Sequence, residues 1–304
     1  MNELLNIKNL QVPLGKVDVV LDTDAFNEID DQYAIAYLLK SKEKLNTKAI
    51  YAAPFSRAGS GTPEDGMEKS YNEIIKLLSL LGEDVPVFKG AKEYLKDEKT
   101  PSVSPVAYDL AERANQYSPE NPLYVVAIGA ITNIASAILL NPKVIKNTVV
   151  VWLGGHAYHY EDSVEFNLKQ DIAAARVVFS SGVSLVQLPC KGVVNQFSIS
   201  KPDLKEWLLG KNELTDYLAK ITIEHVEEYD KNPYWSKPIW DVTAVAWLLN
   251  DNNRFMKSRL VTAPIPSYDG HYTSVLNNHL INYIYFINKE ELMEDLINKL
   301  TKVN

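Results

Sequence analysis

Short apolar runs alternate with longer amphipathic segments through the first two thirds of the chain. The apolar runs are four to six residues long, the length of strands buried on both faces, and the segments between them have the spacing of helices. This repeated order of strand and helix predicts an α/β fold with an open, mostly parallel sheet and helices on both faces. The expected strands are 17–21, 49–53, 85–88, 123–128, 148–153 and 184–188, and the expected helices are 29–40, 71–81, 106–116, 133–140 and 171–180.

From about Pro202 the pattern becomes richer in helices. No linker rich in proline, glycine or serine divides the chain and no internal repeat is present, so we expect one domain over residues 1–304. Residues 51–67 are expected to form a long loop beside the active site. The later helices are expected at 204–209, 213–228, 241–249 and 290–300, with late strands that can form a hairpin at 260–263 and 282–287.

Acidic residues gather where the first expected strand ends. The ten positions 22–31 hold five acids, which are Asp22, Asp24, Glu28, Asp30 and Asp31. In an open parallel sheet, ligands bind beyond the carboxyl ends of the strands, and this segment follows such an end. Aspartate also caps helices and is stabilised in their first turn, but this accounts for only one or two of the four aspartates.

Carboxylates that converge repel one another and resist burial unless a cation compensates their charge. The ligands of such a cation would all be oxygen atoms. The acidic segment therefore predicts a site for a hard divalent cation, calcium or magnesium, rather than for zinc or copper.

The net charge and the cysteine content exclude several kinds of binding partner and metal site. The net charge is −8, the isoelectric point is about 5.3 and no basic run is present, so a nucleic acid polymer or an anionic membrane is a poor electrostatic match. Cys190 is the only cysteine, which excludes an internal disulfide and a cysteine zinc site. Neither a signal peptide nor an apolar segment long enough to span a bilayer is seen, so we expect a cytoplasmic protein.

The acidic segment resembles the amino-terminal signature of nucleoside hydrolases, in which a strand ends in Asp-x-Asp and two adjacent aspartates open the next helix. Here the link between the two pairs, residues 25–29, is about two residues longer than the family's usual link. The resemblance implies that Asp24 and Asp31 bind calcium, that Asp24 takes the proton of the attacking water, and that Asp30 contacts the ribose.

Residues 129–135 resemble the Gly-x-Leu-Thr-Asn segment that follows a central strand in the same family. The resemblance implies that the backbone carbonyl of Thr132 is a further calcium ligand. A plain helix start is the alternative, because threonine and asparagine both cap helices.

Glu165-Phe166-Asn167 resembles the family's Glu-Phe-Asn motif. The resemblance implies that Glu165 and Asn167 bind the ribose hydroxyls, for which a carboxylate beside a carboxamide is suited, and we expect Phe166 beside the base. A solvated loop is the alternative. Six residues before the glutamate the family usually has an asparagine that contacts the sugar, and here His159 is expected as a substituted sugar contact or as a surface histidine. A zinc site shared with His156 would lack a third ligand.

Trp240-Asp241, before an expected helix, resembles the family's His-Asp pair. The resemblance implies that Asp241 is the third carboxylate on the calcium, with a helix N-cap as the alternative. Some purine-selective members also have tryptophan at this place. Tryptophan transfers no proton at ordinary pH, but Trp240 can stack on a base or pack in the core. Tyr229 and Tyr234 are expected either to wall the base pocket or to be core or interface aromatics.

The order of these segments is that of the family, and the resemblance implies calcium-dependent hydrolysis of the N-glycosidic bond of ribonucleosides, with a leaning toward purines. The alternatives are a calcium-dependent nucleoside- or ribose-binding protein with little or no catalysis, and a hydrolase of another riboside. Members commonly form homodimers or homotetramers, and we expect the same here.

Overall fold

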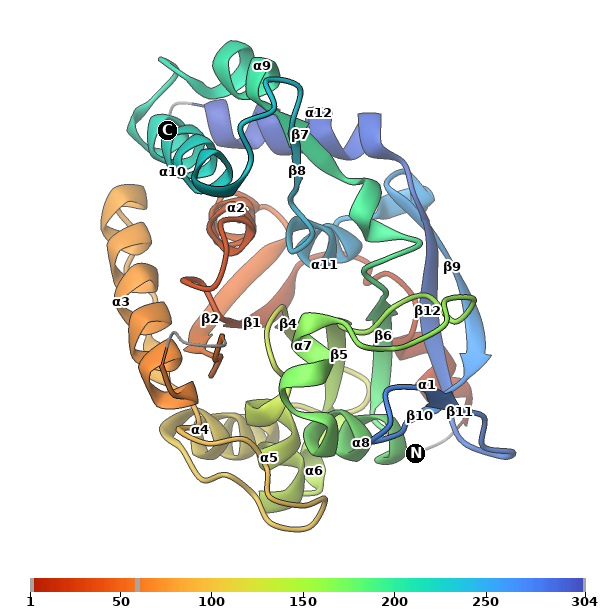
Figure 1. The fold of residues 1–304 in the computed structure, drawn as a ribbon. Helices are drawn as coiled ribbons and strands as arrows, with labels where there is room; N and C mark the ends of the chain where they lie inside the picture. The colour runs from red at the N-terminus through yellow and green to blue at the C-terminus, as the bar shows by residue number, and fades with distance from the viewer. Residues whose placement is uncertain (1–2, 58–60, 303–304) are drawn as a thin grey trace.

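The computed structural model describes residues 3–57 and 61–302. Strands and helices alternate along the chain in the predicted order (Figure 1). The strands are β1 (Val17–Thr23), β2 (Leu45–Ala52), β3 (Val87–Lys89), β4 (Leu123–Ala127), β5 (Thr148–Leu153), β6 (Ser184–Leu188), β7 (Ser198–Ser200), β8 (Ser236–Pro238), β9 (Met256–Thr262), β10 (Ile265–Pro266), β11 (Tyr272–Thr273) and β12 (Leu280–Ile287). The helices are α1 (Glu3–Asn9), α2 (Asp30–Leu39), α3 (Pro63–Leu81), α4 (Pro105–Arg113), α5 (Thr132–Leu140), α6 (Lys143–Asn147), α7 (Phe166–Gln170), α8 (Ile172–Ser180), α9 (Lys201–Asp203), α10 (Glu213–Tyr229), α11 (Val242–Leu248) and α12 (Lys289–Thr301).

Within these residues, eight strands form one sheet in the order β3-β2-β1-β4-β5-β6-β12-β9. Neighbouring strands are parallel except at one edge, where β9 pairs antiparallel with β12. The mostly parallel sheet and the late hairpin are thus both confirmed. From β1 the chain builds the sheet outward through β2 and β3, and then returns to place β4 on the other side of β1. The strand order therefore reverses between β1 and β4.

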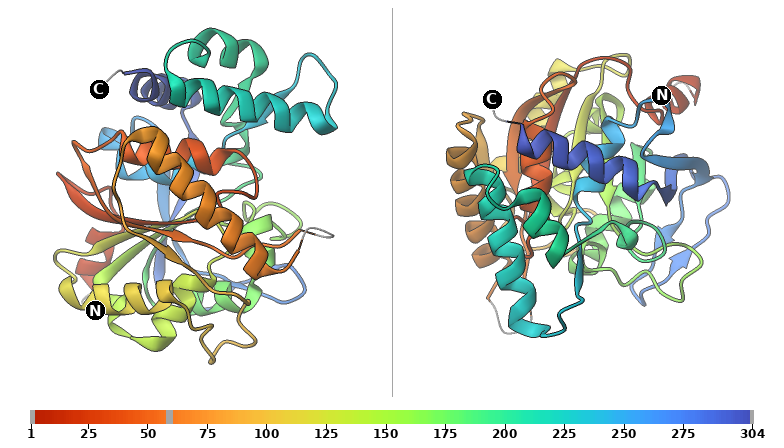
Figure 2. Two further views of the ribbon diagram at one scale, coloured as in Figure 1. Left: turned by 90° about the vertical axis from the view of Figure 1, so that its left-hand side faces the viewer. Right: turned by 90° about the horizontal axis from the view of Figure 1, so that it is seen from above.

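Helices cover both faces of the sheet. Figures 1 and 2 show α2, α11 and α12 on one face and α4, α5 and α8 on the other. Along β1, Val19 and Leu21 pack into the buried cluster on the α2 face, whereas Val20 packs into the cluster on the opposite face. Successive side chains of a strand point to opposite faces, so a sheet covered on both sides needs continuous apolar runs. This is why the short apolar runs predicted the sheet.

The segment after β2 differs from the prediction. We expected a loop over 51–67 and a helix over 71–81, but α3 begins at residue 63. A capping box starts this helix, because the Thr62 side chain accepts from the Asp65 amide and the Asp65 carboxylate accepts from the Thr62 amide. Residues 63–67 of the predicted loop are therefore the first turn of a long helix, and residues 58–60 of that loop lie outside the described residues.

Two small antiparallel pairs, β7 with β8 and β10 with β11, were not predicted, since each strand has only two or three residues. In the part of the chain that the structure describes, no helix has both the length and the apolar composition needed to cross a membrane.

Candidate active site

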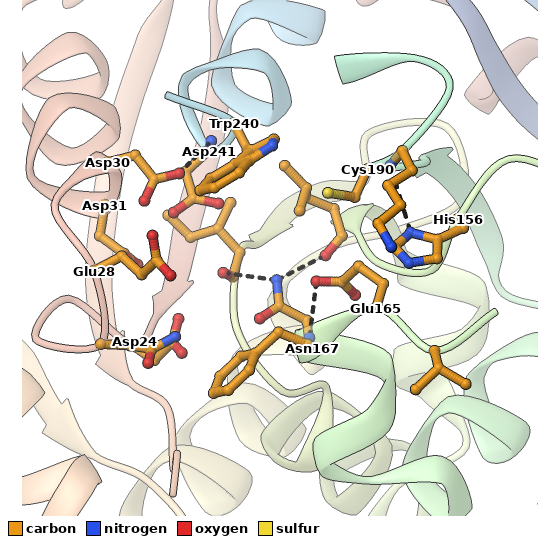
Figure 3. Close-up of a pocket in the computed structure, with 16 residues that line it drawn as sticks. Asp24, Glu28, Asp30, Asp31, His156, Glu165, Asn167, Cys190, Trp240 and Asp241 are labelled. Atoms are coloured by element: carbon orange, nitrogen blue, oxygen red, sulfur yellow. Dashed lines mark hydrogen bonds between the residues drawn. The ribbon is translucent and has the colours of Figure 1, made fainter. Parts of the chain in front are cut away.

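A cavity of about 240 Å³ lies where β1, β4, β5 and β6 end (Figure 3). This is the point at which the strand order reverses, the usual place for a ligand in an open α/β sheet. Figure 3 shows four aspartates on one side of the cavity, His156 and Cys190 on the other, and Glu165 and Asn167 between them. The lining residues are Asp24, Asn27, Glu28, Asp30, Asp31, Ile128, Leu153, His156, Val164, Glu165, Phe166, Asn167, Cys190, Lys191, Trp240 and Asp241.

Three carboxylates from two helix starts converge in this cavity. One carboxylate oxygen each from Asp30, Asp31 and Asp241 lies within 4.8 Å of the others, and all three residues are buried. Asp30 and Asp31 open α2, and Asp241 immediately precedes α11. The Asp241 amide donates to Asp30 Oδ2 at 3.2 Å, and the Thr23 hydroxyl donates to Asp31 Oδ1 at 2.5 Å. Two of the predicted metal carboxylates, Asp31 and Asp241, are in this cluster, and its third member is Asp30 rather than Asp24. Asp30 and Asp241 are 211 positions apart in the chain.

These aspartates do not act as helix caps. Asp241 occupies the N-cap position of α11, yet its side chain makes no capping hydrogen bond within the described residues. Among the same residues, the N-cap of α2 is Ile29, which also caps nothing with its side chain. Asp30 and Asp31 nevertheless lie in the first turn of α2, where a helix stabilises acidic side chains, so only the capping part of the alternative is excluded.

Keeping these three carboxylates ionised without a cation is energetically unfavourable, because they are buried away from water and repel one another. Burial, and then the nearby Asp30 carboxylate, raises the pKa of Asp31 to about 8 and holds that of Asp241 well above its usual value. Burial raises the pKa of Asp30 to about 6, against the lowering effect of Lys237. A divalent cation would remove this penalty, and oxygen-only donors match calcium or magnesium. The residues present therefore fit the cation that the sequence predicted.

Asp24 lies at the end of β1 beside the three converging carboxylates. It is buried, and burial followed by the Asp31 charge holds its pKa well above the ordinary value. Its Oδ2 is buried and has no hydrogen-bond partner among residues 3–57 and 61–302. This oxygen is therefore available to a cation or to a proton.

Asn133 ties the end of β1 to the start of α5. Its amide nitrogen donates to Asp22 Oδ1 at 2.7 Å, and its Oδ1 accepts from the Ala91 amide at 2.8 Å. The neighbouring Thr132 hydroxyl donates to Asp171 Oδ2 at 2.7 Å. The segment is a helix start, as the alternative held, because α5 begins at Thr132, but neither of these side chains caps it. Thr132 is not one of the described residues that line the cavity, and its carbonyl as a cation ligand stays a prediction.

Glu165 and Asn167 form the wall between the two ends of the cavity, and the alternative of a solvated loop is wrong because both are buried. Glu165 is the N-cap of α7: its Oε1 accepts from the Asn167 amide and its Oε2 from the amides of Gly155 and Leu168. Burial raises the pKa of Glu165 to about 7. The Asn167 side-chain amide donates to the carbonyls of Ile128 and Leu153, which leaves its own carbonyl oxygen for a ligand.

His156 and His159 both lie in the turn after β5, but one is buried and the other is exposed. His159, the expected sugar contact, is exposed with its ring against Tyr160, and it is not among the described residues that line the cavity. His156 is 3% exposed and lines the cavity instead. The structure therefore supports the surface alternative for His159. The two histidines differ only in the direction in which the turn after β5 points them, and no local pattern distinguishes His156 from His159 before the fold is known.

The longer link between the two aspartate pairs brings Asn27 and Glu28 to the cavity wall. Arg57 donates to Asn27 Oδ1 at 2.7 Å and to Glu28 Oε1 at 3.1 Å, and Lys237 pairs with the other Glu28 oxygen. The sequence showed the extra length of this link but not its partners, which lie 29 and 209 positions further along the chain.

Trp240 lines the cavity beside this charged network. Lys237 Nζ lies 4.3 Å from the centroid of the Trp240 ring, and the indole N–H donates to Asn195 Oδ1 at 2.9 Å. The indole is partly buried, so Trp240 is a wall of the cavity rather than a fully buried core residue.

Among the other aromatic residues expected at the base pocket, only Phe166 lines the cavity within the described residues. Tyr234 is 89% exposed because the next residue, Trp235, turns inward to the core. Tyr229 is the last residue of α10, is 64% exposed, and packs edge-on against His225. The structure therefore places neither tyrosine at the cavity.

Comparison with known proteins agrees with this geometry. The model of the family described as inosine-uridine preferring nucleoside hydrolase matches residues 19–275. The chain belongs to this family. The matched range of this nucleoside hydrolase includes all the carboxylates around the cavity together with Asn167 and Trp240. The protein is accordingly an N-glycosyl hydrolase that acts on ribonucleosides.

Relatives of this nucleoside hydrolase differ in the base that their names specify. The pyrimidine-specific ribonucleoside hydrolase RihA of Citrobacter koseri is 29% identical over 248 residues, which cover 72% of this chain and 76% of RihA. A plant nucleoside hydrolase has a similar fold, with a TM-score of 0.74 and 19% identity over 94% of this chain and 99% of that one. The purine-preferring ribonucleoside hydrolase from Gardnerella vaginalis also has a TM-score of 0.74, with 18% identity over 93% and 98% of the two chains.

Proposed function

We propose that this nucleoside hydrolase works with a calcium ion held by Asp24, Asp31, Asp241 and the backbone carbonyl of Thr132. The observation that carries the proposal is the convergence of the buried carboxylates of Asp30, Asp31 and Asp241 at the reversal point of the sheet, with the buried Asp24 carboxylate beside them. When bound, the ion supplies positive charge that offsets the carboxylates, holds the neighbouring ribose hydroxyls and lowers the pKa of the attacking water.

Asp24 is the proposed general base. A general base must reach the proton that it removes, and the Oδ2 of Asp24 makes no other hydrogen bond within the described part of the chain. It would accept the proton of the water that attacks the anomeric carbon. Its place at the end of β1, in the middle of the sheet, fixes it relative to the sugar.

Asp30, Glu165 and Asn167 are the proposed ribose contacts. The free carbonyl of Asn167 accepts from a sugar hydroxyl, and the nearby carboxylates favour the positive charge that develops on the ribose ring as the glycosidic bond breaks. Glu165 keeps its place because three backbone amides bind it.

Trp240 and Phe166 are the proposed contacts of the base, and we propose a leaning toward purines. The Trp240 ring is fixed by its bond to Asn195 and by Lys237, so it offers a preformed surface for stacking. The indole N–H is not acidic enough to transfer its proton at ordinary pH, so protonation of the leaving base must come from solvent or from another acid.

Replacing Trp240 by alanine should lower kcat/KM for inosine by roughly 3- to 10-fold, the usual effect of one aromatic stacking contact. The loss for p-nitrophenyl riboside should be smaller, because that leaving group needs little help. Trp240→Phe is the matched control and should retain most of the activity. Equal losses on inosine, uridine and p-nitrophenyl riboside, or better turnover of uridine than of inosine by the unaltered enzyme, would count against stacking.

The cation is tested by incubating the protein with a nucleoside panel, with and without a chelator, and measuring free ribose. Hydrolysis should stop on chelation and return with calcium. Recovery with magnesium alone would show that magnesium is the metal, and full activity in the chelator would show that no metal is needed.

We also propose that the protein forms a homodimer or homotetramer, which light scattering tests, and that it is cytoplasmic, which cell fractionation tests. A modified riboside turned over faster than every common nucleoside would favour the alternative substrate class.

A further inference from the structure

Lys237 is a buried lysine beside the cavity, and its charge has no part in the chemistry proposed above. It lies in β8, is 5% exposed, and its ammonium group pairs with the Glu28 carboxylate. Lysine is rarely buried, because removing its charge from water is unfavourable unless a partner compensates it. A buried ammonium group next to a reaction site can act on any charge that develops there.

The ammonium group of Lys237 lies over the ring of Trp240. Its Nζ is 4.3 Å from the ring centroid, which is the geometry of a cation–π contact. Trp240 lines the cavity (Figure 3), whereas Lys237 is not among the described residues that do. The indole therefore separates the ammonium group from the cavity. A base stacked on the ring at about 3.5 Å would lie about 8 Å from the positive charge.

Other charged groups surround this ammonium group. Arg57 donates to Glu28 Oε1 at 3.1 Å, so two cations share the Glu28 carboxylate. Glu28 lines the cavity, and its side chain is 30% exposed. The ammonium group also faces Asp30, whose pKa it lowers. Arg57, Lys237 and Glu28 together carry one net positive charge beside Trp240.

Cleavage of the glycosidic bond puts negative charge on the base. When the bond between the anomeric carbon and the base nitrogen breaks, its electron pair stays on that nitrogen. The attacking water gives its oxygen to the carbon and its proton to Asp24. Unless an acid protonates the base at the same time, it leaves as an anion, and Trp240 transfers no proton at ordinary pH. A fixed positive charge sheltered from water stabilises such an anion without rearrangement during the reaction.

We propose that Lys237 stabilises the departing base as an anion across the Trp240 ring, in place of an acid that protonates it. The inference rests on the proposed function for the stacking of the base on Trp240. The base takes its proton from solvent after the bond has broken. Lys237 does not touch the substrate, so its effect should grow with the negative charge that the leaving group carries in the transition state.

The test compares kcat/KM of Lys237→Met with that of the unaltered enzyme for inosine, uridine and p-nitrophenyl riboside. Coulomb attraction over about 8 Å, at an effective dielectric constant near 20, predicts a loss of roughly 10- to 50-fold for the two nucleosides. The loss for p-nitrophenyl riboside should be less than about 3-fold, because this better leaving group has gained less charge in the transition state. Lys237→Arg keeps the charge and should retain most of the activity on all three.

Glu28→Gln separates this role from a structural one. Both Lys237→Met and Glu28→Gln break the ion pair, so a purely structural pair predicts equal losses in the two variants and on all three substrates. If the charge of Lys237 acts on the base, removal of the Glu28 carboxylate strengthens its effect, and kcat/KM for inosine should not fall in Glu28→Gln. Equal losses in the two variants, or on all three substrates in Lys237→Met, would overturn the inference while leaving the hydrolase function intact.

Lys44→Met is the matched control. Lys44 is also a buried lysine, 9% exposed, and pairs with Asp251 Oδ1 at 2.6 Å, but it is not one of the described residues that line the cavity. Its replacement should leave kcat/KM within about 2-fold of the original for all three substrates, as for substitutions remote from a site. A loss as large as that in Lys237→Met would show a general effect of an unpaired acid and would overturn the inference. Circular dichroism checks the fold of every variant.

An absence of turnover with every nucleoside would overturn the proposed function instead. Binding of xanthine, a purine base that loses a proton near neutral pH, would then test Lys237. At about pH 8 in calcium buffer, tryptophan fluorescence should show that xanthine binds the unaltered protein about 10-fold more tightly than Lys237→Met, whereas the neutral base hypoxanthine should bind both equally. Equal or undetectable binding of xanthine to the two proteins would reject the inference.

Discussion

Replacing Asp24 by asparagine should lower kcat for nucleoside hydrolysis by roughly 10³-fold, within the range that general bases contribute. Asparagine has nearly the same shape, so the fold and the cavity should be kept, but its amide cannot take a proton from water. Release of ribose measures kcat, and circular dichroism checks the fold. Because Asp24 is also a proposed cation ligand, calorimetry should show weaker calcium binding in the variant.

Asp18→Asn is a suitable control for this substitution. Asp18 is on the same strand, where it binds Tyr117 and Asn46 at the opposite end from the cavity, and its replacement should leave kcat within about 2-fold of the original, as for substitutions remote from a site. A variant at position 24 that retained most of the turnover would assign the proton transfer to another group.

The second large effect concerns the protein without its cation. We expect the free energy of unfolding of the metal-free protein to fall as the pH rises from about 4 to about 8, by an amount on the order of several kcal/mol. Burial holds the pKa of Asp22 at about 7 and that of Asp31 at about 8, whereas aspartate in the unfolded chain titrates near 4. Between these values the folded state binds more protons than the unfolded state, so each rise in pH favours unfolding.

Urea denaturation at pH 5.5 and pH 8, in a chelator and in excess calcium, measures this effect. Calcium at about 100 times its dissociation constant should add roughly 2.7 kcal/mol of stability, and the gain should be larger at pH 8. Asp31→Asn should weaken both the dependence on pH and the response to calcium. A metal-free protein that is as stable at pH 8 as at pH 5.5 would show that burial and the neighbouring charges do not raise the pKa values of Asp22 and Asp31 in this way.

The central strands of the sheet were predictable because they are covered on both faces and therefore consist mostly of continuous apolar residues. The run 148–153, for example, is a strand with the predicted bounds. The start of α3 was not predicted, because the polar residues of its first two turns resemble a loop and only the Thr62–Asp65 capping box distinguishes them. The strands β7, β8, β10 and β11 are too short to have a pattern of their own.

The acidic end of the site was predictable for a different reason. Asp24, Asp30 and Asp31 lie in one short segment at the end of a strand, so local spacing was enough to bring them together. The other end depends on contacts between distant segments. His156 differs from His159 only in which side of a turn it occupies, and the role of Glu28 depends on Lys237, 209 positions away. The spacing of residues along a single sequence does not reveal either of these contacts.

The hydrogen bond between the Asp241 amide and Asp30 joins residues separated by 211 positions. During synthesis the amino-terminal aspartates leave the ribosome long before Asp241 does. The nascent chain therefore has an incomplete set of carboxylates until Asp241 has been made, 211 positions after Asp30. Catalytic competence consequently cannot precede the synthesis of Asp241, and a chain truncated before this residue should have none.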